Sequence, residues 1–378
     1  KPGTKTLMRN TDGTIAIDAS GRDAPSKNAG ITILNTRNIT DKPATAPFFM
    51  TKQDTKTLFV RYMERGTGHI YELPVGQSEL RKISDTTLTK TYETLWGQNG
   101  KTLIARRLDD AGLIENLYSY IEEAGTSSTT IGVAVGKITS TKISGNVKTL
   151  AVSPDHTKFF YLNKIDNDFV GYISDFSGKT LATRKTQTFS SPTGSWNISW
   201  PNSNIISFLT KPSANIHGSL YFLNLKTQGF EKILGEINGL MALVSPDAKK
   251  ILYTASTKGS ISTYVYNVAT NESVILPIKT LVDKCIWSLS NSDLVYCAIP
   301  TSVLAGDYPD DWYQGIVSFS DEIWKVDVKT SRTELIAGKN LFQSGGGVDV
   351  ENLSLSPNED YLAFTNKRDS TPWIIKTR

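Results

Sequence analysis

The chain is poor in the residue types that build metal and thiol sites, and it has no long apolar run. Among its 378 residues are 3 histidines and 2 cysteines. No stretch approaches the roughly 18 consecutive apolar residues of a membrane-spanning helix. The histidines His69, His156 and His217 are far apart in sequence, so we expect no histidine metal cluster. So few cysteines are consistent with a compartment that discourages free thiols.

Common catalytic signatures are also missing. The absence of a G-x-S-x-G motif excludes the nucleophile elbow of an α/β-hydrolase, and the absence of H-E-x-x-H excludes a typical zinc peptidase. The run "SGGGVD" at Ser344–Asp349 lacks the Lys-Ser/Thr pair of a phosphate loop, so we interpret it as a connecting segment. A glycosidase or a lyase would use a pair of carboxylates, and such a pair cannot be recognised from a short sequence motif. An acid–base enzyme therefore stays among the alternatives.

The numbers of basic and acidic side chains are nearly equal. The 41 basic and 37 acidic side chains leave a formal net charge of +4, which is too small to predict a nucleic-acid partner. The hydrophobic and charged fractions, 39% and 21%, are typical of a globular protein with a large core. Because the chain starts at Lys1 rather than Met, we expect that an N-terminal segment has been removed, in which a signal peptide or a membrane anchor would not be visible here.

One short phrase recurs along the chain. It reads "AVSPDHTKFFY" at Ala151–Tyr161, "LVSPDAKKILY" at Leu243–Tyr253 and "SLSPNEDYLAF" at Ser354–Phe364. Ser-Pro-Asp favours a turn, because Pro presets φ and Asp can bond to the backbone two residues on. The flanks are rich in β-branched and aromatic residues, so each phrase predicts a β-hairpin. With looser versions, seven turns are anchored at Asp54, Asn99, Asp155, Asn202, Asp247, Ser290 and Asn358.

Each hairpin is followed by a second pair of strands, as in "SLYFLNLKTQGFEKIL" and "EIWKVDVKTSRTELI". Four strands at intervals of roughly 45 residues are the signature of a β-propeller blade. The last copy stops after three strands, and Ile33–Ile39 resembles the orphan fourth strand of a blade. We therefore predict an all-β fold: a seven-bladed propeller at 33–378 with four-stranded antiparallel blades, in which Ile33–Ile39 pairs with Pro372–Lys376. Residues 1–32 would be an extension or an extra hairpin, and a turn near Asp12 leaves eight blades as the alternative.

The turn signature resembles that of TolB-like and WD40-like (PD40) propeller repeats, in which "SPDG" closes the inner hairpin. The glycine is kept only at Gly100 and is replaced by His156, Ala248 or Glu359 elsewhere. The chain is also similar to envelope propeller proteins of small-genome bacteria. The resemblance implies a propeller and an extracytoplasmic location, in the periplasm or at the cell surface. It implies no particular activity.

Loop lengths distinguish the two faces of the predicted ring. The turns between first and second strands, and between third and fourth strands, lie on one face, which we call the turn face. The connections between second and third strands and between blades lie on the other, the loop face. Nearly all extra residues fall on the loop face, including Thr210–Gly218 and Ala298–Phe319. Since function concentrates on loops carried by a rigid scaffold, we expect the loop face to bind a partner.

The most unusual segment is the insertion "AGDYPDDWYQGIVSFSDEIW" at Ala305–Trp324. Exposed aromatic residues are typical of partner-binding surfaces, and clustered carboxylates can hold Ca²⁺. A structural alternative is that the loop folds back and buries its rings over the blade. The candidate binding residues here are Asp307, Tyr308, Asp310, Asp311, Trp312 and Tyr313.

Two arginines occupy equivalent positions in the first two blades. Arg61 and Arg106 each lie seven residues past the turn anchor, so the two guanidinium groups could form an anion site. The alternative is structural pairing with nearby acidic residues, namely Glu64, Glu93, Asp109 or Asp110.

The two cysteines are symmetric about one hairpin. Cys285 and Cys297 each lie six residues from Asn291 in the turn of the sixth blade, so a regular register places them opposite each other. Facing Cβ atoms in a hairpin are about 4.5–5.5 Å apart, which is within reach of a slightly strained disulfide. The alternative is two buried free thiols.

Two functional hypotheses follow. The first is a non-catalytic extracytoplasmic binding or scaffold protein that presents the loop face to a protein or glycan of the cell envelope, with no cofactor unless Ca²⁺ binds the insertion. The second is a glycosidase- or lyase-type propeller enzyme that uses carboxylates near the central channel. The enzyme requires a deep pocket that contains two carboxyl groups with displaced pKa values.

Overall fold

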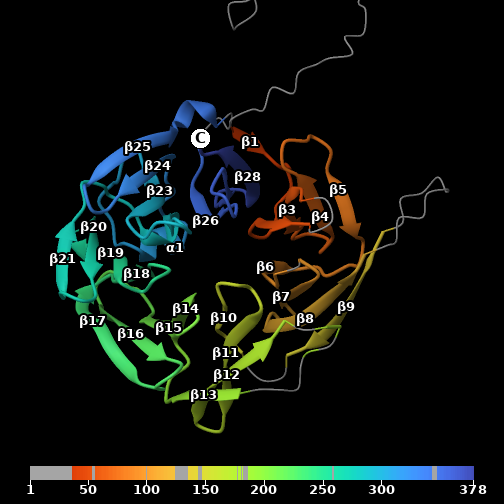
Figure 1. Cartoon of the computed structure of the whole chain (residues 1–378), viewed down its shortest axis with the longest axis horizontal. Helices are drawn as coiled ribbons and strands as arrows, with labels where there is room; N and C mark the ends of the chain where they lie inside the picture. Colours follow the sequence, from red (N-terminus) through yellow and green to blue (C-terminus); the bar gives the residue numbers. More distant parts are fainter. Residues whose placement is uncertain are drawn as a thin grey trace, which may run out of the picture. The chain divides into compact units, whose positions relative to one another are not determined.

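The computed structural model describes residues 36–52, 56–98, 100–123, 135–143, 147–176, 178–179, 181, 186–257, 259–342 and 347–378. These residues form a seven-bladed β-propeller, in which seven four-stranded antiparallel sheets follow one another around a ring (Figure 1). The predicted fold class is therefore confirmed. The region near Asp12, where an eighth blade would begin, and the turn anchors Asp54 and Asn99 lie outside the described residues.

Blades one to three contain the following strands: β2(Phe48–Thr51), β3(Leu58–Met63), β4(Ile70–Pro74) and β5(Arg81–Ser84); β6(Thr91–Trp96), β7(Thr102–Leu108), β8(Ile114–Glu122) and β9(Lys137–Lys142); and β10(Leu150–Val152), β11(Lys158–Ile165), β12(Asp168–Asp175) and β13(Thr186–Ser191). Blades four and five contain β14(Trp196–Asn202), β15(Ile205–Thr210), β16(His217–Asn224) and β17(Phe230–Asn238), then β18(Met241–Val244), β19(Lys250–Thr257), β20(Ser260–Asn267) and β21(Glu272–Ile275).

Blade six contains β22(Cys285–Trp287), β23(Leu294–Pro300), β24(Asp321–Asp327) and β25(Arg332–Ala337). Blade seven contains β26(Val350–Leu355), β27(Tyr361–Asn366) and β28(Thr371–Lys376), and β1(Thr36–Asn38) completes it. The described helices are short: η1(Val282–Lys284), α1(Asp310–Tyr313) and η2(Lys339–Leu341). None of the helices in the described segments has the length and apolar character needed to span a membrane.

The ring is closed by strands from opposite ends of the described chain. β1 pairs with β28 in antiparallel register, with Thr36 opposite Ile375 and Asn38 opposite Trp373. Figure 1 shows β1, in red, beside the dark blue strands of blade seven. The predicted pairing of Ile33–Ile39 with Pro372–Lys376 is confirmed within the described residues. The closure leaves the last blade with a paired outer strand instead of an open edge.

The divergent turn residues keep the backbone conformation that glycine would favour. His156, Ala248 and Glu359 have φ values of 55°, 56° and 58°. In each turn the backbone N–H of this residue donates to the serine carbonyl three positions earlier, over 2.8 Å. A left-handed conformation costs a residue with a Cβ about 1–2 kcal/mol. The turn geometry is thus kept by the hairpin even where the favoured residue is lost.

The core consists of apolar side chains packed between adjacent blades. The cluster between blades five and six joins Met241 and Leu252 of one blade to Trp287 and Val295 of the next. Trp312, from the insertion between β23 and β24, belongs to the same cluster. Each inner strand is therefore held on both sides by its neighbours, which makes the sheets a rigid support for the loops.

Candidate functional site

The loop face carries most of the exposed large apolar side chains of the described residues. Nine of these lie in, or next to, connections on the loop face: Leu108, Leu113, Ile114, Ile165, Ile216, Leu304, Tyr313, Ile316 and Leu341. The turn face has two, Phe230 and Leu289, and the outer strands have three, Val274, Ile275 and Leu335. Single exposed apolar residues are ordinary, but their concentration on one face is a feature of interaction surfaces.

The insertion folds back over blade six. Trp312 is 2% exposed and Tyr308 is fully buried, so the expectation that these two rings are presented to a partner is wrong. The rings are buried because they fill the space between blades five and six, where Tyr308 stacks on Phe319 at 5.7 Å. Tyr313 differs, since 41% of its surface is exposed.

Two carboxylates of the insertion accept hydrogen bonds from backbone N–H groups and so help to hold the insertion in place. Asp310 Oδ2 accepts a hydrogen bond from the backbone N–H of Ala214 in blade four, over 2.6 Å. Asp311 Oδ2 accepts from the backbone N–H of Asp307, over 2.8 Å. In the parts of the chain that the structure describes, no three His, Cys, Asp or Glu side chains gather in a way that could hold a metal ion. The suggested Ca²⁺ therefore has no evident ligand set there.

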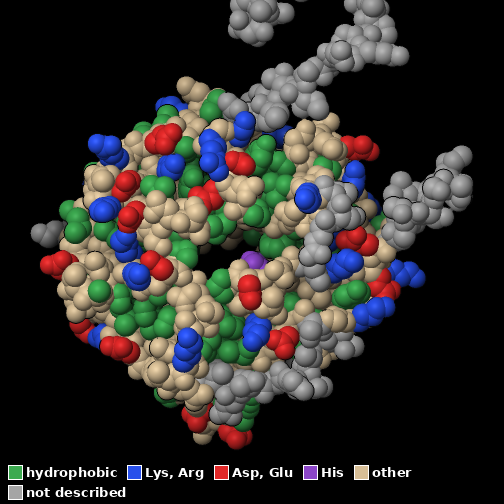
Figure 2. Space-filling view, in the orientation of Figure 1, with side chains coloured by type: hydrophobic (Ala, Val, Ile, Leu, Met, Phe, Trp, Pro, Cys, Tyr) green, Lys and Arg blue, Asp and Glu red, His purple; other side chains and the backbone are tan. Residues whose placement is uncertain are grey.

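Tyr313 makes a hydrogen bond on the solvent-exposed side of the insertion. Its hydroxyl donates to Asp283 Oδ2 over 2.7 Å, and Asp283 itself is exposed. In Figure 1, α1 lies on the inner side of blade six, toward the centre of the ring. Figure 2 shows an opening at the centre of the ring.

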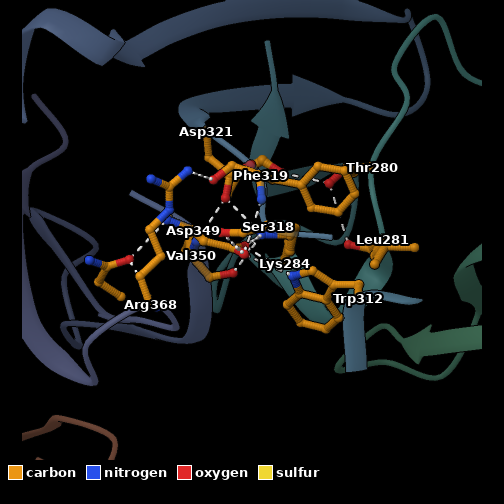
Figure 3. A network of polar contacts seen from close by, with 12 residues as sticks. Thr280, Leu281, Lys284, Trp312, Ser318, Phe319, Asp321, Asp349, Val350 and Arg368 are labelled. Carbon is orange, nitrogen blue, oxygen red and sulfur yellow. Dashed lines mark hydrogen bonds and ion pairs between the residues drawn. The ribbon is translucent and has the colours of Figure 1, made fainter. Parts of the chain in front are cut away.

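A buried ionic network anchors the insertion to blade seven (Figure 3). Lys284 contacts both Asp321, over 2.7 Å, and Asp349, and it also donates to the Val350 carbonyl over 3.0 Å. The Trp312 indole N–H donates to Asp349 Oδ1 over 3.0 Å. Lys284 and Asp321 are fully buried, and Asp349 is 1% exposed. Sequence reasoning missed this network, although a lysine inside the apolar run "LVDKCIW" was a signal for it.

Arg61 and Arg106 are both paired with carboxylates. Arg61 is fully buried and donates to Glu72 over 2.6 Å and to Glu123 over 2.9 Å. Arg106 donates to Glu93 over 2.6 Å. The structure therefore favours structural pairing over an anion site. Glu93 was among the predicted partners, whereas Glu72 was missed: it lies opposite Arg61 across β3 and β4.

A cleft of about 560 Å³ lies between blades four and five. Its lining includes Tyr253 and Tyr264, which stack with centroids 4.9 Å apart. It also includes His217 and Glu236, whose Nδ1 and Oε2 atoms are 3.4 Å apart, and Asp307 of the insertion. A hydrogen bond from Lys232 lowers the pKa of Glu236, so this carboxylate is ionised at neutral pH and unsuited to act as a general acid.

The two cysteines lie opposite each other and are joined. Cys285 of β22 pairs directly with Cys297 of β23, and their Sγ atoms form a disulfide. The Cα atoms are 4.1 Å apart. This is the directly opposed register that the symmetric spacing about Asn291 predicts.

No protein-family model matches this chain, and the search of curated proteins also finds no match. Among solved structures the chain is similar to an oligogalacturonate lyase in complex with manganese, at 10% identity and a TM-score of 0.56, covering 91% of this chain and 93% of that chain. An oligogalacturonate lyase from Vibrio parahaemolyticus gives 12% identity, the same coverages and a TM-score of 0.56.

The β-propeller domain of Cps50 (Swd1) from Myceliophteria thermophila is also similar, at 12% identity and a TM-score of 0.51, covering 91% of this chain and 100% of that chain. At such identities the likeness shows the fold alone. The resemblance to propeller repeat proteins is therefore confirmed at the level of the fold.

Proposed function

We propose that this protein is a non-catalytic binding or scaffold protein that presents its loop face to a protein partner of the cell envelope. The observation that supports the proposal most is the gathering of exposed apolar side chains at loop tips of that face, with Leu113, Ile216 and Ile316 more than 60% exposed. Covering exposed apolar side chains with a protein surface removes them from water, and this burial contributes favourable free energy to binding. A glycan, by contrast, is usually held by exposed aromatic rings and polar groups.

The binding test is a site-specific photo-crosslinking experiment. A photoreactive amino acid replaces Leu113, Ile216 or Ile316 on the loop face, and Leu289 on the turn face serves as the matched control, since it is also exposed. After irradiation in native envelope extract, the three loop-face positions should capture the same protein while Leu289 captures none. Equal capture from both faces, or different proteins from each loop position, would contradict a defined binding face.

The extracytoplasmic location is part of the same proposal. The Cys285–Cys297 disulfide supports it, because such bonds persist mainly in oxidising compartments. The test is titration with Ellman's reagent of protein purified from its native host and denatured without reductant. Absence of free thiol is the expected result, and two titrating thiols would contradict both the disulfide and the argument for the compartment.

A lyase-type enzyme is the second candidate function. Its support is a pair of carboxyl groups: Glu351, whose pKa is raised by burial, and the exposed Asp283, which accepts a hydrogen bond from the Tyr313 hydroxyl. Each is adjacent in sequence to a partner of the hydrogen bond between Lys284 Nζ and the Val350 carbonyl, so the two groups belong to the same region. The raised pKa of Glu351 suits proton transfer near neutral pH.

The enzyme test is incubation with oligogalacturonate and other acidic oligosaccharides, followed by the ultraviolet absorbance of unsaturated products. Activity that is lost in Asp283→Asn would favour the lyase. No product from any substrate, together with defined crosslinks on the loop face, would favour the binding protein.

A further inference from the structure

Lys284, Asp321 and Asp349 form a buried cluster where blade six meets blade seven. One ammonium group and two carboxyl groups are packed together out of contact with water. Burial raises the pKa of Asp321, and its Oδ1 atom is buried without a hydrogen-bond partner. Burial thus disfavours the charged form of Asp321, which lies beside the contact between Lys284 and Asp349.

The surroundings of this pair are apolar and aromatic. Lys284 Nζ lies 4.9 Å from the ring centre of Trp312 and 5.2 Å from that of Phe319. In Figure 3 the side chains of Lys284, Asp321 and Asp349 converge on one another. Such walls exclude water, which would otherwise stabilise the separated charges and compete as a nucleophile.

Both oxygens of the Asp349 carboxyl group contact hydrogen-bond donors, as the oxygens of a carbonyl group under nucleophilic attack do in enzymes. Its Oδ1 atom contacts Lys284 Nζ. Its Oδ2 atom accepts hydrogen bonds from the Trp312 indole N–H over 3.2 Å, the Ser318 hydroxyl over 3.0 Å and the Phe319 backbone N–H over 3.1 Å. The indole N–H is shared with Oδ1 at 3.0 Å, so two donors are directed at Oδ2 alone and a third is divided between the two oxygens. Donors directed at a carboxyl oxygen are the arrangement that stabilises the oxyanion of a tetrahedral intermediate.

We propose that Lys284 and Asp349 condense in the folded protein to an amide bond between Nζ and Cγ, which cross-links blade six to blade seven. The ammonium group first gives a proton to the carboxylate, and the free amine attacks Cγ. Asp321, in contact with Nζ over 2.7 Å, accepts a proton from nitrogen and returns one to the departing hydroxyl. The ion pair thus becomes one amide and one water molecule, and Asp321 ends in its starting protonation state.

The fold favours this condensation in two ways that are absent in water. In solution an ammonium carboxylate is more stable than its amide because both charges are hydrated. Here the charges are already stripped of water, so condensation removes two costly buried charges. The amine and the carboxyl group are also held together by the packing of two blades, which replaces a bimolecular encounter by an intramolecular step.

Intact-mass spectrometry of the full chain tests the proposal, after the disulfide has been reduced and alkylated. The wild-type protein should be lighter than its sequence mass by one water molecule. In a tryptic digest, a bond to Asp349 joins peptides 280–325 and 340–367, whereas a bond to Asp321 stays within 280–325. A wild-type mass equal to the sequence mass, in protein shown to be folded by its circular dichroism, would overturn the proposal.

Two variants assign the roles. Lys284→Met should have its full sequence mass, while a succinimide at Asp12–Gly13, which also loses water, would persist in that variant. Asp321→Asn keeps the shape of the side chain but cannot relay protons, so it should also keep its full mass. A cross-linked Asp321→Asn protein would refute the role of Asp321, and a joined peptide pair that lacks Asp349 would refute the assigned electrophile.

Discussion

Trp312→Ala is the substitution that most directly separates a structural insertion from an exposed binding loop. The indole is 2% exposed, packs between blades five and six, and donates its N–H to Asp349. Removing a buried tryptophan costs about 3–5 kcal/mol of unfolding free energy, because the cavity is only partly refilled. Asp349 also loses a hydrogen-bond donor, which adds to the cost.

Two further variants separate the contribution of ring packing to this loss of stability from that of the hydrogen bond. Trp312→Phe keeps an aromatic ring but removes the N–H, so it should cost about 1–3 kcal/mol. Tyr313→Ala, in the same helix but 41% exposed, should cost about 1 kcal/mol, chiefly for the hydrogen bond to Asp283. The ordering of the three losses follows from burial and does not depend on their absolute sizes.

The assay is urea denaturation followed by far-ultraviolet circular dichroism, which is insensitive to the loss of one indole fluorophore. The denaturation midpoint should fall most for Trp312→Ala and least for Tyr313→Ala. If Trp312→Ala keeps the wild-type midpoint, or falls no further than Tyr313→Ala, the insertion is not part of the core and the packing argument fails.

Three further predictions concern individual residues. Arg61→Ala leaves the buried Glu72 with Lys52 as its remaining ionic partner and should cost about 3 kcal/mol of unfolding free energy, whereas Arg106→Ala, whose partner Glu93 has a side chain that is 39% exposed, should cost about 1 kcal/mol. Equal losses in urea denaturation would contradict the difference in burial. Ala248→Gly should raise the melting temperature, because it relieves a φ of 56° and the gain of about 1–2 kcal/mol exceeds the added unfolded-state entropy; a lower melting temperature would show that the methyl packs usefully. Burial opposes ionisation of Glu359, but hydrogen bonds from Ser290 and Ser288 outweigh it and lower its pKa, so its contribution is present above the unfolded-state pKa and is lost as pH falls through the folded-state pKa; stability against pH should therefore converge for wild type and Glu359→Gln in acid, and a constant gap would refute the shift.

The propeller was predictable because its signals are local and repeated. A turn such as Ser245–Ala248 with strand-forming flanks specifies a hairpin by itself, and its recurrence specifies the blade. The closing strand β1 was predictable for a related reason, since a three-stranded last copy leaves an edge that must be paired. The register of Cys285 opposite Cys297 followed from counting residues on either side of one turn.

The sequence by itself thus determined the blades, the ring closure and the division into a loop face and a turn face, because those features follow from a local pattern, its repetition and its incomplete last copy. Only the tertiary structure decided the fate of side chains in the insertion, where Trp312 is buried and Tyr313, its neighbour, is exposed. It also brought Lys284, Asp321 and Asp349 together across 65 positions of the chain. The reason is that a loop outside the repeat has no periodic pattern to orient its side chains, so their burial depends on the surfaces of the two adjacent blades.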